Sequence, residues 1–144
     1  ARFRKGLAFC AVLYSLSESC VLMQTRLPDG FMGRDYHSSG WCFFEACVSS
    51  ILKPTKRRWD IDKCNGGSSV SSYRLPPRTP GRFEEDLSRK RFTTGADVRA
   101  VKQLYRNTFE DAAGSAKELI FYECGWSMAQ LPILSESLPH FIFC

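Results

Sequence analysis

The stretch DYHSSGWCFFEAC, residues 35–47, decides how this chain can fold. A serine at position 38 or 39 can cap a helix that starts near Gly40, and Pro54 ends that helix after Lys53. At 100° per residue, Phe43 and Ser50 fall on a side where we expect solvent. The opposite side gathers an apolar stripe made of Trp41, Phe44, Val48, Ile51 and Leu52.

Glu45 lies at the shoulder of this stripe, one turn after Trp41. A carboxylate beside a buried seam must be hydrogen-bonded, paired or protonated, because an isolated buried charge is strongly destabilising. If Glu45 borders a cleft, its pKa should rise, and such carboxylates are candidates for catalysis or ligand binding. The alternative is that Glu45 reaches water or pairs with a nearby arginine such as Arg34.

The flanking sequence alternates between helical and strand-like segments. Helices are predicted over 2–17, from Thr79 onward with Pro80 in the first turn, from the capping box 94–97 to Gly114, and over 127–138 with a kink at Pro132. Short apolar runs predict strands over 20–25, 59–62 and 118–123, and the segments 26–39 and 64–78 are predicted loops. This alternation predicts an α/β sandwich with a mostly parallel sheet.

The composition excludes several classes of protein. The 144 residues are 44% hydrophobic and 24% charged, which is typical of one globular domain with a core. The net charge of +5 is mild and both signs are interleaved, so we expect no nucleic-acid binding, and the basic runs 53–58 and 89–91 are interpreted as solvated faces. No apolar run reaches the ~18 residues of a membrane span.

The start of the chain allows two interpretations. The basic residues Arg2, Arg4 and Lys5 precede an apolar run over 6–16, as in a signal peptide. The spacing of its apolar residues also fits an amphipathic helix, which we favour.

The seven cysteines form no CxxC pair, and the chain has two histidines, so no metal site is expected. Cys10, Cys42 and Cys47 lie in apolar runs and are interpreted as buried thiols in a reducing, cytoplasmic setting. Disulfides remain the alternative.

Residues 36–45, YHSSGWCFFE, resemble the segment Tyr-x-Ser-Ser-x-Trp-Cys-x-x-Glu of TIR domains. The resemblance implies a flavodoxin-like, three-layer α/β fold with a parallel sheet, whose first strand would lie before residue 1, so that the domain is expected to be truncated. In catalytic TIR domains the glutamate cleaves the bond between nicotinamide and ribose in NAD. By that resemblance Glu45 would be the catalytic acid, with Ser39 near the same pocket and Tyr36 and Trp41 beside the bound NAD.

A broader resemblance covers residues 3–141. Uncharacterised proteins of unicellular eukaryotes carry a Gly-Trp-x-x-Phe-Glu segment and a Phe-Thr-x-Gly-Ala-Asp segment, here 92–97, sometimes followed by leucine-rich repeats. We therefore predict a TIR-like domain over 1–115 and a strand-plus-helix tail over 116–144, similar to the start of a leucine-rich repeat.

Two functions follow from these patterns. The first is a TIR-like signalling module that binds protein partners or itself, with no cofactor. The second is an NAD glycohydrolase-type enzyme that uses Glu45, with NAD as its substrate. No membrane partner is expected in either case.

Overall fold

The computed structural model describes residues 2–63 and 73–142, except for the side chains of residues 2–5 and 8. Among the described residues, those in helices far outnumber those in strands, so this is a mixed but mainly helical protein. The α-helices are α1 (Arg2–Ser15), α2 (Gly40–Val48), α3 (Pro80–Leu87), α4 (Ala96–Ser115) and α5 (Leu131–Ser137). The strands are β1 (Val21–Met23) and β2 (Arg58–Asp60), and short 3₁₀ helices are η1 (Thr55–Arg57), η2 (Ile61–Lys63), η3 (Met128–Gln130) and η4 (Leu138–His140). The predicted loop 64–78 lies outside the described residues over 64–72.

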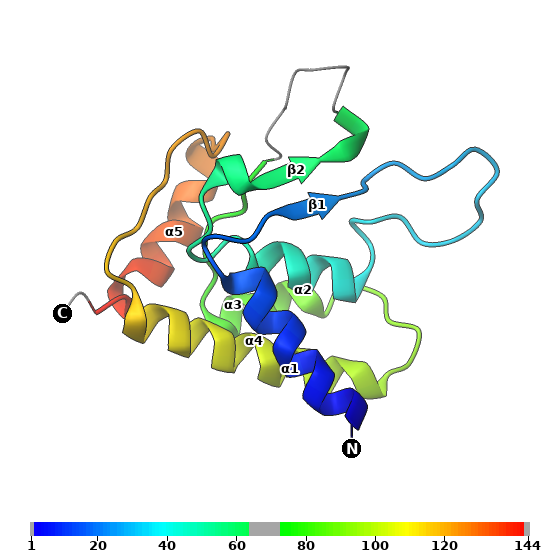
Figure 1. Ribbon diagram of the computed structural model, residues 1–144, viewed down its shortest axis with the longest axis horizontal. Helices are drawn as coiled ribbons and strands as arrows, with labels where there is room; N and C mark the ends of the chain where they lie inside the picture. The colour runs from blue at the N-terminus through cyan, green and yellow to red at the C-terminus, as the bar shows by residue number, and fades with distance from the viewer. Residues whose placement is uncertain (1, 64–72, 143–144) are drawn as a thin grey trace.

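The two strands form a small parallel sheet with α2 as the connection between them (Figure 1). Leu22 pairs in register with Trp59, and Met23 with Asp60. Parallel strands run in the same direction, so the chain must cross back between them, usually through a helix. A tight turn joins only antiparallel strands. The strand predicted over 20–25 exists in shortened form as β1, whereas the strand predicted over 59–62 starts one residue earlier, at Arg58, and its last two residues belong to η2.

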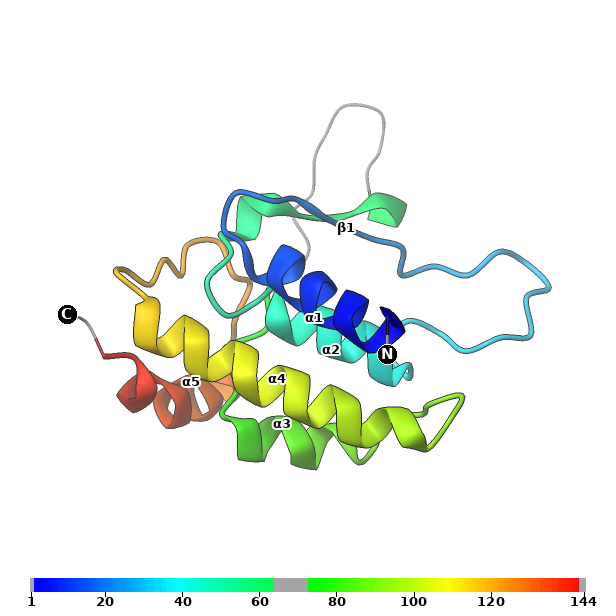
Figure 2. The ribbon, with the colours of Figure 1, turned by 60° about the horizontal axis from the view of Figure 1, so that its bottom comes forward.

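The expected three-layer flavodoxin-like sandwich is not clearly formed. Helices α1 to α4 lie on one side of the sheet (Figures 1 and 2). On the other side Leu22 is 68% exposed, so no helical layer covers it among the described residues. A sheet of two short strands has one buried face, whereas the sandwich needs two.

The strand predicted over 118–123 does not form. The backbone carbonyl of Tyr122 accepts a hydrogen bond from the Thr55 hydroxyl at 2.9 Å, and that of Ile120 accepts one from the Arg74 guanidinium. Glu123 and Gly125 then adopt positive φ angles of 52° and 69°, which turn the chain. Side chains thus take the carbonyls that a neighbouring strand would have used.

The core is built from aromatic rings of α2, α3 and α4. Phe83 stacks on Phe43 with ring centroids 5.4 Å apart and on Tyr105 at 3.8 Å. Phe109, on the next turn of α4, contacts Phe141 near the end of the chain at 5.8 Å. Both Tyr105, at 0% exposure, and Phe109, at 1%, are fully buried on the inner face of α4.

Helix α2 lies at the centre, and three predictions about it are wrong. Phe43 is partly buried in the aromatic core and Ser50 is fully buried, because α1, α3 and α4 pack around the helix and Arg58 of β2 donates to the Ser50 hydroxyl. The helix also ends at Val48 rather than Lys53. Beyond that point the carbonyls of Ser50 and Ile51 accept hydrogen bonds from Arg74, at 3.1 and 3.0 Å.

Among the predictions about the other helices, the cap of α3 is confirmed and three others are wrong. Thr79 caps α3, with its hydroxyl accepting from the Arg82 amide at 3.2 Å. The capping box predicted at 94–97 is absent, because Asp97 accepts a hydrogen bond from Trp41 instead, and α4 continues past Gly114. Pro132 stands in the first turn of α5, where no helical hydrogen bond is lost, so it does not kink the helix.

Two surface predictions are also corrected. The basic run 53–58 is not a solvated face throughout, because Lys53 is 0% and Arg58 1% exposed. Lys53 donates to the carbonyl and the hydroxyl of Ser19, at 2.8 and 2.7 Å, and burial lowers its pKa to about 8. Cys47 is buried as predicted, but Cys42 is only partly buried and Cys10 is exposed, and all three thiols are free.

Candidate functional site

The loop-to-helix junction of the TIR-like segment is held by a distant part of the chain. The Ser39 side chain accepts a hydrogen bond from the Cys42 amide at 3.4 Å and so caps α2. The Gly40 amide donates to the carbonyl of Arg91 at 2.9 Å, and the Arg91 amide donates to the carbonyl of Ser38 at 2.9 Å. Ser39 therefore serves as the helix cap in this structure.

Gly40 and Trp41 contact the second segment singled out in the sequence. A Cβ atom added at Gly40 would lie 2.2 Å from the ring of Phe92, so only glycine fits under that ring. The Trp41 indole donates to the Asp97 carboxylate at 3.2 Å, and its ring meets Phe44 edge-on at 5.9 Å. The two sequence segments thus form one structural junction.

Glu45 lies half-buried where α1 packs against α2. Burial raises the pKa of its carboxyl, and a hydrogen bond from the Tyr14 hydroxyl opposes that rise. Burial and the same carboxylate raise the pKa of Tyr14 to about 12. Arg34, the partner considered from the sequence, contacts Thr93 instead at 3.4 Å.

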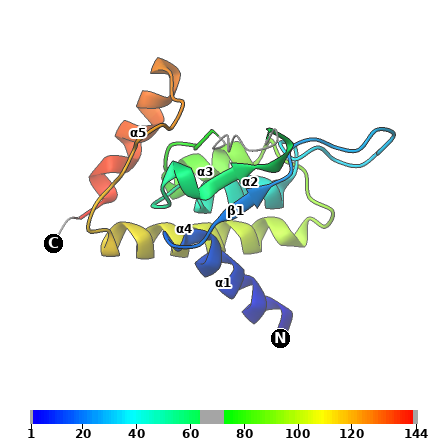
Figure 3. The same ribbon diagram turned by 45° about the horizontal axis from the view of Figure 1, so that its top comes forward.

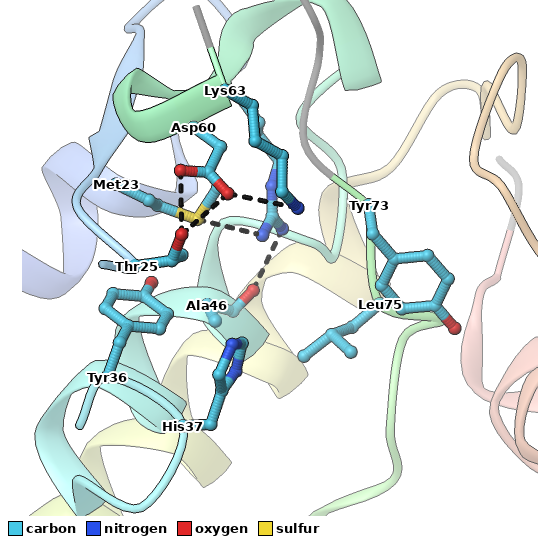
Figure 4. Close-up of a pocket in the computed structure, with 10 residues that line it drawn as sticks. Met23, Thr25, Tyr36, His37, Ala46, Asp60, Lys63, Tyr73 and Leu75 are labelled. Carbon is cyan, nitrogen blue, oxygen red and sulfur yellow. Dashed lines mark hydrogen bonds and ion pairs between the residues drawn. The ribbon is translucent and has the colours of Figure 1, made fainter. Parts of the chain in front are cut away.

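A pocket of about 330 Å³ opens at the carboxyl ends of the two strands (Figure 4). In parallel sheets this is the edge where ligands commonly bind, because loops diverge there and leave room. The side chains around it come from the two strands, the residues just after each strand, the TIR-like segment, α2 and the segment before α3. They are Met23, Thr25, Tyr36, His37, Ala46, Arg58, Asp60, Lys63, Tyr73 and Leu75.

The acid of the pocket is Asp60, which is 1% exposed. Its carboxylate accepts hydrogen bonds from the Thr25 hydroxyl at 2.8 and 2.9 Å and forms an ion pair with Lys63 at 3.2 Å (Figure 4). The Lys63 side chain is 59% exposed, so the ion pair lies between the buried interior and the rim.

The buried base of the pocket is Arg58. Its guanidinium donates to the carbonyl of Ala46 at 3.0 Å, to the Ser50 hydroxyl and to the sulfur of Met23 at 3.6 Å. All three acceptors are neutral. The third nitrogen, Nε, is buried and has no hydrogen-bond partner within the described ranges. Burial lowers the pKa of Arg58 to about 10, so the group remains charged near neutral pH.

Of the four residues predicted for the site, one reaches the pocket. Tyr36 lines it together with His37, whereas Ser39, Trp41 and Glu45 do not line it. Burial raises the pKa of Tyr36, and the charges of both Arg58 and Glu45 act on its hydroxyl.

Arg58, Asp60 and Thr25 were not predicted from the sequence as residues of the site. Arg58 ends the basic run 53–58, which was interpreted as a solvated face. A signal was present, since Arg58, Trp59 and Asp60 alternate on a strand and place two charged residues on its buried side. Only the fold could show that this side faces a pocket.

Within residues 2–63 and 73–142 no group of three or more His, Cys, Asp or Glu side chains could hold a metal ion. In the same ranges no helix combines the length and the apolar character needed to cross a membrane.

No protein-family model, no curated protein and no solved structure matches this chain. Its function therefore has to be inferred from its own residues.

Proposed function

We propose that this chain is a TIR-like interaction module that pairs with a second copy of itself through the outer side of α1. One observation carries the proposal, namely that α1 is apolar on two sides. Ala11 and Tyr14 pack inward against the core. The outer side exposes Phe9 by 72%, Val12 by 52%, Leu13 by 59% and Leu16 by 44%.

These four residues follow the spacing i, i+3, i+4 and i+7, which forms a continuous stripe along a helix. Helix α1 lies at the edge of the molecule (Figure 3). A groove beside it contains Leu13 together with Val21 and the 68% exposed Leu22 of β1. A helix that is apolar on opposite sides is normally covered on both, because exposed apolar area lowers stability in water.

A second copy is the partner that the charge pattern favours. Residues 6–16 contain no charged side chain, although the protein carries a net charge of +5. Two positive molecules repel each other least where each presents an uncharged face. A twofold axis would set the stripe of one copy against the same stripe of the other, as closed dimers require.

We also propose that the fold of this chain is flavodoxin-like. The β1–α2–β2 unit supports it, because flavodoxin-like sheets are built from parallel strands with helical crossovers. The TIR-like segment begins the crossover helix, as the resemblance implies.

Sedimentation velocity tests the dimer. We expect the chain to sediment as a dimer and the Leu13→Asp variant to sediment as a monomer, with a Kd raised at least ~100-fold because two charges become buried in each dimer. The matched control is Met32→Asp, which places the same charge on a residue that is 97% exposed on the loop before α2. A monomeric chain at high concentration, or a dimer that survives Leu13→Asp, would reject the proposal.

NAD glycohydrolase-type catalysis is the second candidate, and the raised pKa of Glu45 favours it. A carboxylate near the scissile bond can stabilise the oxocarbenium-like state that forms when a sugar C–N bond breaks. NAD turnover by the chain should then fall at least ~100-fold in Glu45→Gln but not in Glu123→Gln, a change at an exposed position. Equal turnover in both variants would exclude Glu45 as the catalytic acid, and no turnover by the chain itself would remove this candidate.

A further inference from the structure

We propose that the pocket at the carboxyl ends of β1 and β2 binds a small organic carboxylate, with the Arg58 guanidinium as its counter-charge. This inference goes beyond the proposed dimer and does not depend on it. It rests on the cavity, on the surroundings of Arg58, and on the chemistry of the pocket wall.

Arg58 is a buried charge without an anionic partner. Its side chain is 1% exposed, and no ion pair joins it to a carboxylate in the part of the chain that the structure describes. Its acceptors are a carbonyl, a hydroxyl and a thioether, and its Nε–H is unsatisfied. A buried cation in this state is destabilising, and a bound anion would relieve that penalty.

Asp60 forms no ion pair with Arg58 among the described residues. The Asp60 carboxylate is directed to the Thr25 hydroxyl and the Lys63 amine, as Figure 4 shows. Asp60 pairs with Lys63, whereas Arg58 forms no ion pair with a carboxylate in the described ranges, so Arg58 is the cation available to a bound anion. A single available cation favours a ligand with one negative charge, and Asp60 would repel a second one.

The other residues that line the pocket indicate the chemistry of the uncharged part of the ligand. Met23, Ala46 and Leu75 are apolar, and the ring of Tyr36 adds a flat surface. The volume of about 330 Å³ is at the lower end of small-molecule sites. A small apolar or aromatic molecule that carries one carboxylate fits both the charge and the size.

Benzoate is a suitable probe, and its binding can be followed by two-dimensional NMR of the ¹⁵N-labelled chain. We expect the amide signals of Thr25, Ala46 and Asp60 to shift with saturation. The neutral analogue benzamide should bind at least about tenfold more weakly, and the dianion phenyl phosphate should also bind more weakly than benzoate. Absence of saturable shifts, equal binding of benzamide, or tighter binding of phenyl phosphate would each overturn the proposal.

Substitutions test whether benzoate binds in this pocket. Arg58→Gln should weaken benzoate binding at least about tenfold, whereas Arg57→Gln, which removes the same charge from the exposed neighbouring residue, should leave it within about twofold. Leu75→Trp should abolish binding because it fills the pocket, and it decides the question if Arg58→Gln fails to fold. Unchanged binding in Leu75→Trp would place benzoate elsewhere and reject the site.

The proposed dimer and the proposed ligand binding can be tested separately. The Leu13→Asp variant should bind benzoate like the unmodified chain, because Leu13 does not line the pocket. Loss of benzoate binding in this variant would contradict the stated independence of the two proposals.

Discussion

At the scale of single residues, the structure holds several polar groups away from water and satisfies most of them. Glu45 is half-buried and receives a hydrogen bond from Tyr14, whereas Arg58 is fully buried with one donor unsatisfied. Burial raises the pKa of the acid and lowers that of the base, because it disfavours the charged form of each. These groups make the stability of the protein depend on pH.

Glu45→Gln should change the pH dependence of unfolding. The pKa of Glu45 is raised above its ordinary value of 4.5 in the folded state, so folding binds a proton and stability falls as the pH rises above 4.5 through the folded pKa. Thermal unfolding should therefore show a higher Tm for Glu45→Gln than for the unmodified chain at pH 7, and no such gain at pH 4. Glu118→Gln, at an exposed position, should show no gain at either pH.

Tyr14→Phe should raise the pKa of Glu45 further. The Tyr14 hydroxyl donates to the carboxylate and favours its charged form, so the loss of this donor leaves burial unopposed. Titration of the Glu45 side-chain carboxyl by ¹³C NMR measures the shift, with Tyr122→Phe, at a ring that is 72% exposed, as the control. A Glu45 midpoint that stays unchanged or falls would contradict the hydrogen bond.

At the scale of elements, specific contacts fix the ends of α2 and α3. Thr79 caps α3, Ser39 caps α2, and the close contact of Gly40 with Phe92 joins α2 to the segment before α4. The arginine Arg74 supplies donors to the carbonyls after α2. Substitutions at these positions should therefore act through the helix ends rather than through the aromatic core.

Thr79→Ala should destabilise the protein by about 1 kcal/mol, because the Arg82 amide at the start of α3 loses its acceptor. Thr79→Ser keeps the hydroxyl and should retain most of that free energy. Urea unfolding measures both variants. A Thr79→Ala variant as stable as the unmodified chain would show that the cap contributes nothing.

Gly40→Ala should destabilise the protein by about 1–3 kcal/mol, because the new methyl group would overlap the Phe92 ring. Gly114→Ala is the matched control, since no atom lies within 4 Å of its Cβ position and alanine is a better helix former there. Adding Phe92→Leu to Gly40→Ala should recover part of the loss in a urea double-mutant cycle. Additive free energies would argue that the two residues do not interact.

At the scale of the whole molecule, the aromatic core connects residues from both predicted domains. The rings of Phe43, Phe83 and Tyr105 belong to the predicted domain 1–115, and Phe141 packs on Phe109 from the predicted tail. Trp126 of the tail also donates from its indole to the carbonyl of Arg74. The division at residue 115 remains a prediction that unfolding experiments can examine.

Phe83→Ala and Phe141→Ala should both lower the midpoint of one common unfolding transition. Both side chains are buried, at 0% and 5% exposure, and removal of a buried phenylalanine side chain costs about 3–5 kcal/mol. Circular dichroism and tryptophan fluorescence should report the same midpoint for each variant. If Phe141→Ala instead separates an early transition from a later one, the tail 116–144 unfolds by itself.

The sequence by itself determined which segments become helices and where several of them begin. Local rules are enough for this, because a capping hydroxyl at Thr79, a proline at position 80 and the periodic apolar residues of α4 act within one or two turns. The same local patterns located the two short strands and the position of Glu45 beside a buried seam.

Tertiary structure alone decided what each face meets. Segment 118–123 has the composition of a strand, yet distant Thr55 and Arg74 take its carbonyls. Arg58 stands in a basic run, yet strand pairing turns it inward beside Asp60 at the edge of a pocket. Strand pairing and burial bring together residues that are far apart in the sequence, and a local sequence pattern does not show which of these residues will meet.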